Sequence, residues 1–598
     1  MNKNKRNIAV LILKKGIKWI PVLIFLINAC FVFLSSSDKV SDTWMWVAAL
    51  YLFAAAAITF WFQNGISPNK KMIISSIILS IILVLMLSIK DIVKHPISTN
   101  TFLESELIVF LIISSFLVVY KILEWFISVA NDNSVNSFIW LKILVVVEGL
   151  LFLFANYPFR PSADALDVYL SAMIRNWYDW HTISFELYVA ACMKLGGLFG
   201  WYHPFVACIV QTVIWYIALF RLGNIINIIF GDRAERSWFI INVFMYIPMM
   251  YLGVMYKDVL FSMCLMAFCG ELLHILSIKE ISKLNVIFMA IFGTGAALFR
   301  HGMFVVVAIS TVVAGVYFFN HKKEDNKYLK RIICMAGILF FVLGSYIFMH
   351  IVGDKILGMT KNPSYVKYSV PLYVCANIAS EHPELIEVDD LELLEEIAPI
   401  ETWRNAYESD KYWADTISRP WGIVGDSITK VDNTYGKKLL VLNAKFLVRN
   451  PKVYIDSVTK VTSIIWQIAR PADGYEWSSA GYYWRKDYPE EDPNLYSMDS
   501  GIKKLLENLE VGMWNTPLVS SVYYRGGIWV FIIMIVWAVL IMKGKKELLI
   551  AMLSPMIVFL LMMLSCPAQD PRFALSFMET GMLGLVVARY SNSKKINN

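Results

Sequence analysis

The chain has 598 residues, of which 58% are hydrophobic and 17% are charged. Soluble globular chains carry about 45–50% apolar and about 25% charged residues, so this composition excludes a soluble globular protein, a disordered chain and a collagen. The eight cysteines form no CxxC pair, so no zinc module is indicated. The formal net charge is +7, which by itself would permit a nucleic-acid partner. The composition indicates an integral membrane protein.

A membrane-spanning helix needs about 20 mostly apolar residues. Fourteen stretches fit when taken in chain order, and we expect 12–14 helices in all. The predicted fold class is an all-α polytopic membrane protein with a mainly helical extracytoplasmic domain. The stretches are 17–34, 44–62, 72–88, 107–120, 138–155, 205–222, 238–254, 259–278, 286–298, 303–319, 332–351, 528–542, 548–566 and 573–587.

The loops between these stretches predict the orientation. Cytoplasmic loops carry an excess of Lys and Arg, and with fourteen spans every basic tract falls on one side, with both termini in the cytoplasm. The basic tracts are Lys3–Arg6, Lys70–Lys71, Arg233–Arg236, His321–Arg331, Lys543–Lys546 and Lys594–Lys595.

Residues 352–525 fall on the outer side, and they carry 25 acidic against 19 basic residues, while the rest of the chain carries 22 against 35. The positive charge therefore follows membrane topology, and no nucleic-acid partner is expected. The predicted organisation is an N-terminal transmembrane region 1–351, an extracytoplasmic domain 352–525 and a C-terminal transmembrane region 526–598.

The first long exterior loop, 156–203, carries a group of acidic residues. Two prolines end the preceding helix, and Asp164 and Asp167 then share one face of a short helix because they are three residues apart. Asp179 and His181 follow. Carboxylates at a membrane surface are candidates for general-base catalysis, since burial and a neighbouring acid both raise their pKa. The alternative is that a solvated loop simply carries acids.

Further charges interrupt apolar runs at the same predicted membrane face. They are Lys257 and Asp258, Arg300 and His301, and Arg572, with Arg160 in the loop itself. Charges in such places are expensive and are candidates for function, although interfacial anchoring of long side chains is an ordinary alternative. Because Arg and Lys match phosphate oxygens, a carboxylate beside them predicts a site for a lipid-phosphate substrate.

The order of these motifs resembles GT-C membrane glycosyltransferases, and more closely a group of bacterial multi-pass proteins assigned to that class. The resemblance covers roughly residues 138–303 and the last two spans. Ala163 stands where those proteins have proline, no asparagine follows His301, and no tyrosine follows Arg572. The matching motifs are Tyr157-Pro158, Ser162-Ala163-Asp164, Asp179-Trp180-His181-Thr182, Lys257-Asp258, Arg300-His301-Gly302 and Arg572-Phe573.

The resemblance implies transfer of a sugar from a polyprenyl-phosphate donor to a cell-envelope glycan or glycolipid at the outer face of the membrane. It implies Asp164 as the catalytic base, with Asp167 as the alternative and His181 as an orienting group. Implied substrate-binding residues are Arg160, Asp179, Lys257, Asp258, Arg300, His301 and Arg572.

Some enzymes of this class use a divalent metal, for which Asp164 and Asp167 are the candidate ligands. A transporter or flippase of lipid-linked sugars and a membrane polysaccharide polymerase remain as alternatives. The aromatic run at 474–484 is either a sugar-stacking surface or part of a packed core.

Overall fold

The structure is a computed structural model of the whole chain. It describes residues 70–86, some of residues 116–126, and residues 138–592 apart from short gaps and the longer stretches 419–432 and 471–500. Of the described residues 83% are helical, and none forms a named strand. The predicted spans 17–34 and 44–62 and the aromatic run 474–484 lie outside the described residues. The all-helical class is therefore confirmed for the part of the chain that the structure describes.

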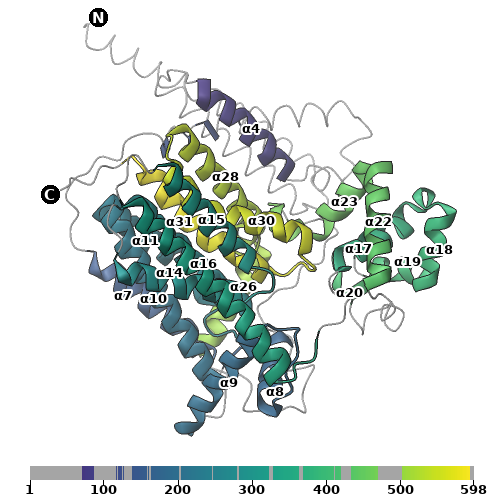
Figure 1. The fold of residues 1–598 in the computed structure, drawn as a ribbon, viewed down its shortest axis with the longest axis horizontal. Helices are drawn as coiled ribbons and strands as arrows, with labels where there is room; N and C mark the ends of the chain where they lie inside the picture. The colour runs from purple at the N-terminus through teal and green to yellow at the C-terminus, as the bar shows by residue number, and fades with distance from the viewer. Residues whose placement is uncertain are drawn as a thin grey trace, which may run out of the picture.

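The long apolar helices run side by side in a bundle (Figure 1). Four of them are long and apolar enough to cross a membrane, and four shorter apolar helices accompany them; a count of fourteen spans is not confirmed. The four long segments are α10 (Phe205–Phe230), α13 (Lys257–Ser277), α16 (Tyr328–Ile351) with the π-helical turn η1 (Val352–Ile356), and α29 (Lys546–Ala551) with α30 (Leu553–Ser565). The four shorter ones are α4 (Lys70–Met86), α14 (Lys283–Leu298), α15 (Phe304–Asn320) and α28 (Gly527–Met542), and α7 (Ile139–Ala155) and α31 (Leu575–Tyr590) also belong to the bundle.

Helix α13 forms the centre of the bundle. It is apolar around its whole circumference, and its residues 258–276 are all buried, chiefly against α10, α14 and α31. A helix that is apolar all round must be buried in protein or lipid. Helix α16 shows the opposite case, because only 17% of its apolar window is buried and Phe340 is 79% exposed. Its uncovered side is therefore apolar, as expected of a helix that crosses a membrane.

The predicted span 238–254 is wrong as a continuous helix. The chain instead forms α11 (Asp232–Phe244) and the single turn α12 (Ile247–Met250), after which residues 251–256 are not helical. Pro248 has no N–H group to continue the helical hydrogen bonds. The non-helical backbone holds the loop before α8 (Ala163–Ile174), because the Gly253 carbonyl accepts a hydrogen bond from the Arg160 N–H at 2.8 Å.

Two of the predicted basic segments, 233–236 and 543–546, lie near the end of α31. Lys543 donates to the Ala588 carbonyl at 3.0 Å and to Ser591 Oγ at 2.9 Å. The hydroxyls of Ser237 and Tyr590 lie 2.8 Å apart. These contacts bring the α28–α29 turn, the start of α11 and the end of α31 together at one end of the bundle.

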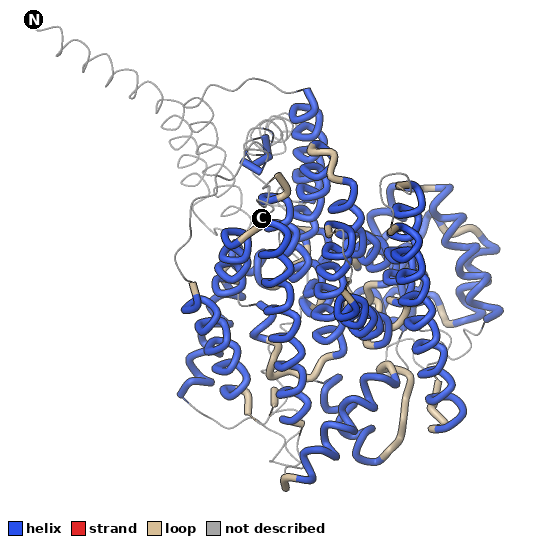
Figure 2. The backbone as a smooth tube through the Cα atoms, turned by 60° about the vertical axis from the view of Figure 1, so that its left-hand side comes forward, coloured by secondary structure: helices blue, strands red, loops and turns tan. Residues whose placement is uncertain are grey.

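Two short helices, α8 (Ala163–Ile174) and α9 (Ile183–Leu198), lie at the other end of the bundle (Figure 1). A separate group of helices, the lateral module, packs beside the bundle around its own apolar core, which includes Tyr373, Trp403 and Phe446. Its elements are α17 (Ser369–Glu381), η3 (Pro383–Leu385), α18 (Val388–Ile397), α19 (Ile400–Ser409), α20 (Asp415–Ser418), α22 (Asn433–Arg449) and α23 (Pro451–Val461). Figure 2 shows the same separation of module and bundle from another side.

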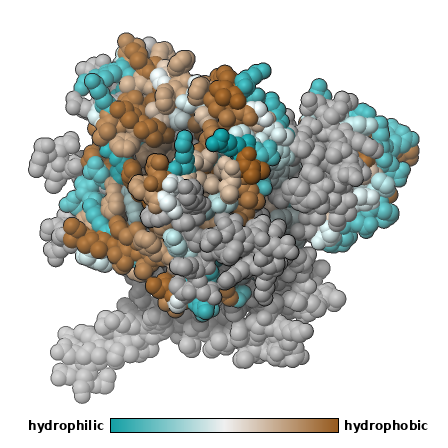
Figure 3. All heavy atoms as spheres, turned by 90° about the horizontal axis from the view of Figure 1, so that it is seen from below, coloured by the Kyte–Doolittle hydropathy of each residue, from teal (hydrophilic) through white to brown (hydrophobic). Residues whose placement is uncertain are grey.

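The chain returns from the module to the bundle through three further helices, α24 (Ser463–Trp466), α26 (Gly501–Asn515) and α27 (Pro517–Tyr523). Met513 and Tyr524 on this return segment belong to the core of the bundle, and Trp466 packs against it. The surface reflects these two environments, because apolar residues cover much of the bundle while the described part of the module is largely hydrophilic (Figure 3).

Candidate functional site

An ion pair between Asp164 and Arg572 lies at the centre of the candidate site. Asp164 is in the first turn of α8, and Arg572 is in the short 3-10 turn η5 (Pro571–Ala574) that leads into α31. The Asp570 side chain caps this turn by accepting from the Arg572 backbone N–H at 3.0 Å, and its carboxylate also lies 3.0 Å from Arg572 Nε. Two carboxylates from distant parts of the sequence therefore hold one guanidinium.

A second ion pair, between Asp258 and Arg300, lies beside the first. Asp258 begins α13 and is 1% exposed, while Arg300 follows α14. The two pairs are connected because Asp258 Oδ2 lies 3.9 Å from Arg572 Nε. The guanidinium groups of Arg300 and Arg572 each lie 5.1 Å from the centre of the Phe573 ring, which adds a cation–π contact to both. We call Asp164, Asp258, Arg300, Asp570 and Arg572 the charged cluster.

The electrostatics of the charged cluster keep Asp164 ionised. Burial would raise its pKa, but the Arg572 and Lys257 cations act in the opposite sense, and the pKa of Asp164 lies well below its usual range. Asp570 behaves differently, because burial outweighs the neighbouring Arg572 and raises its pKa to about 6. Of the two carboxylates on Arg572, Asp164 carries the more persistent charge.

Lys257 and His181 lie on the side of the charged cluster that faces the loop before α9. The Lys257 ammonium donates to the Trp180 carbonyl at 2.8 Å. His181 is 2% exposed, and neither ring nitrogen has a hydrogen-bond partner among the described residues. Burial, followed by the charge of Lys257, lowers the pKa of His181, so its ring is neutral. Its nearest acid is Asp167, at 3.7 Å, whose side chain is 63% exposed.

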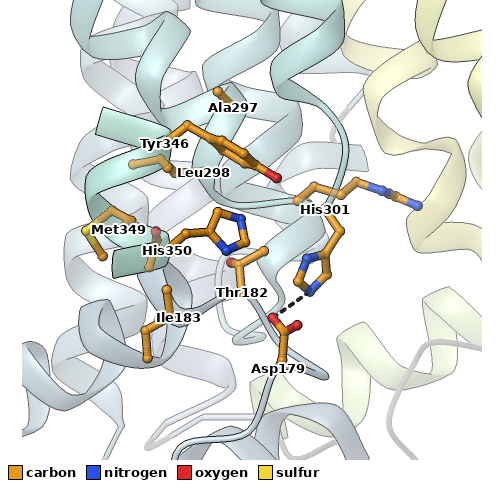
Figure 4. Close-up of a pocket in the computed structure, with 11 residues that line it drawn as sticks. Asp179, Thr182, Ile183, Ala297, Leu298, His301, Tyr346, Met349 and His350 are labelled. Atoms are coloured by element: carbon orange, nitrogen blue, oxygen red, sulfur yellow. Dashed lines mark ion pairs between the residues drawn. The ribbon is translucent and has the colours of Figure 1, made fainter. Parts of the chain in front are cut away.

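A pocket opens between the start of α9 and the outer ends of α14 and α16 (Figure 4). Asp179 and His301 point toward each other across it, 3.9 Å apart, and His350 extends into it from α16. The backbone around Asp179 is fixed by two hydrogen bonds with Thr360, one from the Asp179 N–H at 2.9 Å and one to the Trp177 carbonyl at 3.0 Å. Arg300 also lines this pocket, which joins it to the charged cluster.

Arg160 lies apart from this arrangement. Its guanidinium makes a two-fold contact with the Glu510 carboxylate, at 2.7 and 3.2 Å, and both residues are buried. The pair fixes α26 to the loop that carries Asp164. The contact with Glu510 thus gives Arg160 a positioning role.

The candidate metal ligands do not form a metal site. Asp164 is bound to Arg572, and the exposed Asp167 approaches only His181. Within the described residues no group of three or more His, Cys, Asp or Glu side chains is placed to hold an ion. The residues present do not fit a divalent metal at Asp164 and Asp167.

Three residues of this region were not predicted as part of the site. Tyr346 and His350, one turn apart on α16, line the pocket but lie inside an apolar run. Glu186 on α9 is fully buried, and it accepts a hydrogen bond from the Tyr178 N–H at 3.4 Å. Burial raises the pKa of Glu186 to about 8. A polar pair spaced by four residues near the end of an apolar helix is a signal that could have identified Tyr346 and His350.

Apolar helices of membrane-spanning length with charged groups gathered at one end are the features of a helical membrane protein. The chain belongs to a family of unknown function, DUF6020, whose model matches residues 172–597. That match starts within α8, so Asp164 and Asp167 precede it, whereas His181, Lys257, Arg300 and Arg572 lie inside it. No curated protein and no solved structure matches the chain.

Proposed function

We propose that the protein is a glycosyltransferase resembling the GT-C class, which transfers a sugar from a polyprenyl-phosphate donor to a cell-envelope acceptor at the outer face of the membrane. The observation that carries the proposal is the Asp164–Arg572 ion pair with Arg300 and Lys257 close by. A carboxylate beside several cations provides both a proton acceptor and a binding site for phosphate.

The two arginines and Lys257 are the proposed donor-binding groups. Guanidinium groups bind phosphate oxygens through two parallel hydrogen bonds, and an ammonium adds a point charge. Both Arg572 and Arg300 already hold carboxylates, so the donor phosphate replaces a carboxylate as their partner. For Arg572 this exchange releases Asp164.

Release of Asp164 prepares it to act as a base. While it is paired, the pKa of Asp164 is too low for efficient proton transfer near neutral pH. Once the donor phosphate neutralises Arg572, burial becomes the dominant influence and raises that pKa. In this mechanism the base becomes active only when the donor is bound.

The proposed reaction is a single displacement. The acceptor hydroxyl oxygen forms a bond to the anomeric carbon as the bond from that carbon to the phosphate oxygen breaks, and the configuration inverts. The proton of the hydroxyl passes to Asp164, and the bonding electron pair leaves with the phosphate. Arg572, Arg300 and Lys257 stabilise the negative charge that the phosphate gains. The neutral His181 is placed to orient the acceptor hydroxyl.

The test compares the wild-type protein with Asp164→Asn and with Asp167→Asn as a matched control, each purified and reconstituted in lipid. Transfer and hydrolysis are measured with a panel of radiolabelled polyprenyl-phosphate sugars. Loss of a general base predicts a fall of about 10²–10⁴-fold for Asp164→Asn, and a small change for Asp167→Asn. Equal rates in wild type and Asp164→Asn would refute the assigned base. No turnover with any donor, together with lipid-linked sugar movement across proteoliposomes, would replace the transferase with a transporter.

A further inference from the structure

The pocket of Figure 4 has the chemistry of a saccharide site. Its polar lining contains a carboxylate, two hydroxyls, two imidazoles, a phenol and a guanidinium, from Asp179, Thr182, Ser184, His301, His350, Tyr346 and Arg300. Such groups donate to and accept from sugar hydroxyls. Thr182 is 7% exposed, and its hydroxyl has no hydrogen-bond partner among the described residues. A buried polar group of this kind indicates a ligand that completes its hydrogen bonding.

An aromatic surface borders the same pocket. The Tyr346 ring packs against Phe304, with ring centres 4.4 Å apart, and against His350 at 4.6 Å. These two contacts fix the orientation of the phenol ring. A rigid aromatic side chain beside hydrogen-bonding groups offers an apolar face and a polar rim, the two surfaces that a sugar ring presents.

A second cavity adjoins the pocket on the exposed side of α16. It shares Tyr346 and His350 with the pocket and is lined further by Ile347, Ile351, Asp354 and Lys355. Ile347 is 58% exposed and Ile351 49% exposed, as expected of a helix side that contacts lipid. A molecule with an apolar chain can therefore lie along α16 and place its head group in the pocket.

The order of these features along the path decides which substrate fits. From the bilayer inward the path meets the apolar side of α16, then Tyr346 and His350, then the pocket, and then Arg300 of the charged cluster. In a polyprenyl-phosphate donor the phosphate adjoins the chain, which would place it beside the Asp179 carboxylate. In a glycolipid the sugar lies at this position, and its hydroxyls point toward the charged cluster.

We propose that the pocket is the acceptor subsite and that the acceptor is a glycolipid, a saccharide carried on an apolar chain, which enters laterally from the bilayer over α16. This assignment rests on the proposed transferase function and adds the acceptor class to it. The glycolipid head group is held by Asp179, His301, His350 and Thr182, with one hydroxyl directed toward Asp164. The donor phosphate is held by Arg572, Arg300 and Lys257, next to this pocket.

The test uses the full chain in lipid nanodiscs and measures binding by native mass spectrometry. The probes are dodecyl glucoside and dodecyl maltoside, with octaethylene glycol monododecyl ether as a chain of the same length without a sugar, and free maltose as a sugar without a chain. The wild-type protein is expected to bind the better alkyl glycoside at least tenfold more tightly than either control. His350→Ala and Asp179→Asn are expected to lose that preference. His321→Ala, a histidine variant at the opposite end of the bundle, is expected to keep it.

Equal binding of alkyl glycosides and the sugar-free chain by the wild-type protein would overturn the saccharide pocket, as would a preference that survives His350→Ala. Free maltose binding as tightly as dodecyl maltoside would overturn the lateral route. These results are separate from the donor assay. Donor turnover that depends on Asp164, without a saccharide preference at the pocket, refutes only this inference, whereas absence of turnover with every donor refutes the proposed function.

Discussion

Glu186 provides a test of how burial sets charge beside the candidate site. Its side chain is fully buried, and Oε1 has no hydrogen-bond partner among the described residues. Burial raises the pKa of Glu186 from 4.5 to about 8 in the folded protein. In the unfolded chain the carboxyl group regains its ordinary pKa. Between pH 5 and pH 8 the unfolded state therefore loses a proton that the folded state keeps.

The sign and size of the effect follow from proton linkage. Because the unfolded state binds fewer protons, the free energy of unfolding falls as the pH rises, by at most about 1.36 kcal/mol per pH unit. Over three pH units the fall in the free energy of unfolding that Glu186 causes reaches about 4 kcal/mol. With an unfolding entropy of about 2.1 cal/mol/K per residue, this corresponds to a change in Tm of about 3 °C for a chain of this length.

The perturbation is Glu186→Gln, which keeps the shape of the side chain and an oxygen for the Tyr178 N–H but cannot ionise. Thermal unfolding in nanodiscs at pH 5, 6, 7 and 8 is the assay. The Tm of Glu186→Gln relative to wild type should rise by about 3 °C across this range, whatever the offset at pH 5. Glu395→Gln, which removes an exposed carboxylate of α18, should follow the wild-type curve. Parallel curves for Glu186→Gln and wild type would refute the reasoning.

Three further predictions concern stability. Arg160→Ala leaves the Glu510 charge buried without its partner, and it should lower the free energy of unfolding by about 3–5 kcal/mol in a denaturation assay; replacing both residues should restore part of this loss. Gly526→Ala places a methyl group 2.6 Å from a backbone carbonyl oxygen, so it should lower the Tm, whereas Gly337→Ala, where the added group meets nothing, should not. Burial acts to raise the pKa of Asp390, but the cations of α22 outweigh burial, and the pKa lies below its usual value. The stabilisation that the Asp390 carboxylate provides should therefore be lost as the pH falls below about 4. Asp390→Asn should make the free energy of unfolding depend less on pH in this acid range.

Most of the described helices could be predicted from the sequence because apolar runs of membrane length have few alternatives to a helix. The runs at 259–278 and 332–351 correspond closely to α13 and α16. The run at 238–254 does not correspond to one continuous helix, because its high mean hydropathy gave no indication of the break before Pro248. Hydropathy reports the solvent that a segment prefers, and it does not report whether the backbone hydrogen bonds continue.

The candidate site could be predicted in part. Asp164, Asp258, Arg300 and Arg572 each interrupt or border an apolar run on one predicted side of the membrane, and the structure brings all four together. Their pairing could not be predicted, since an ion pair across 408 positions of sequence depends on how the helices pack. Burial of Glu186 likewise depends on which elements pack against α9, and the sequence of α9 alone does not indicate them.

The pairing of Asp164 with Arg572 also has a consequence for biosynthesis. One partner emerges from the ribosome in the first third of the chain, and the other lies fewer than thirty residues from its end. Until Arg572 is in place, the carboxylate of Asp164 has no guanidinium partner, whereas Asp258 already has Arg300. The Asp164–Arg572 pair therefore forms only after most of the bundle has been synthesised, and a chain that stops before η5 leaves Asp164 without this partner.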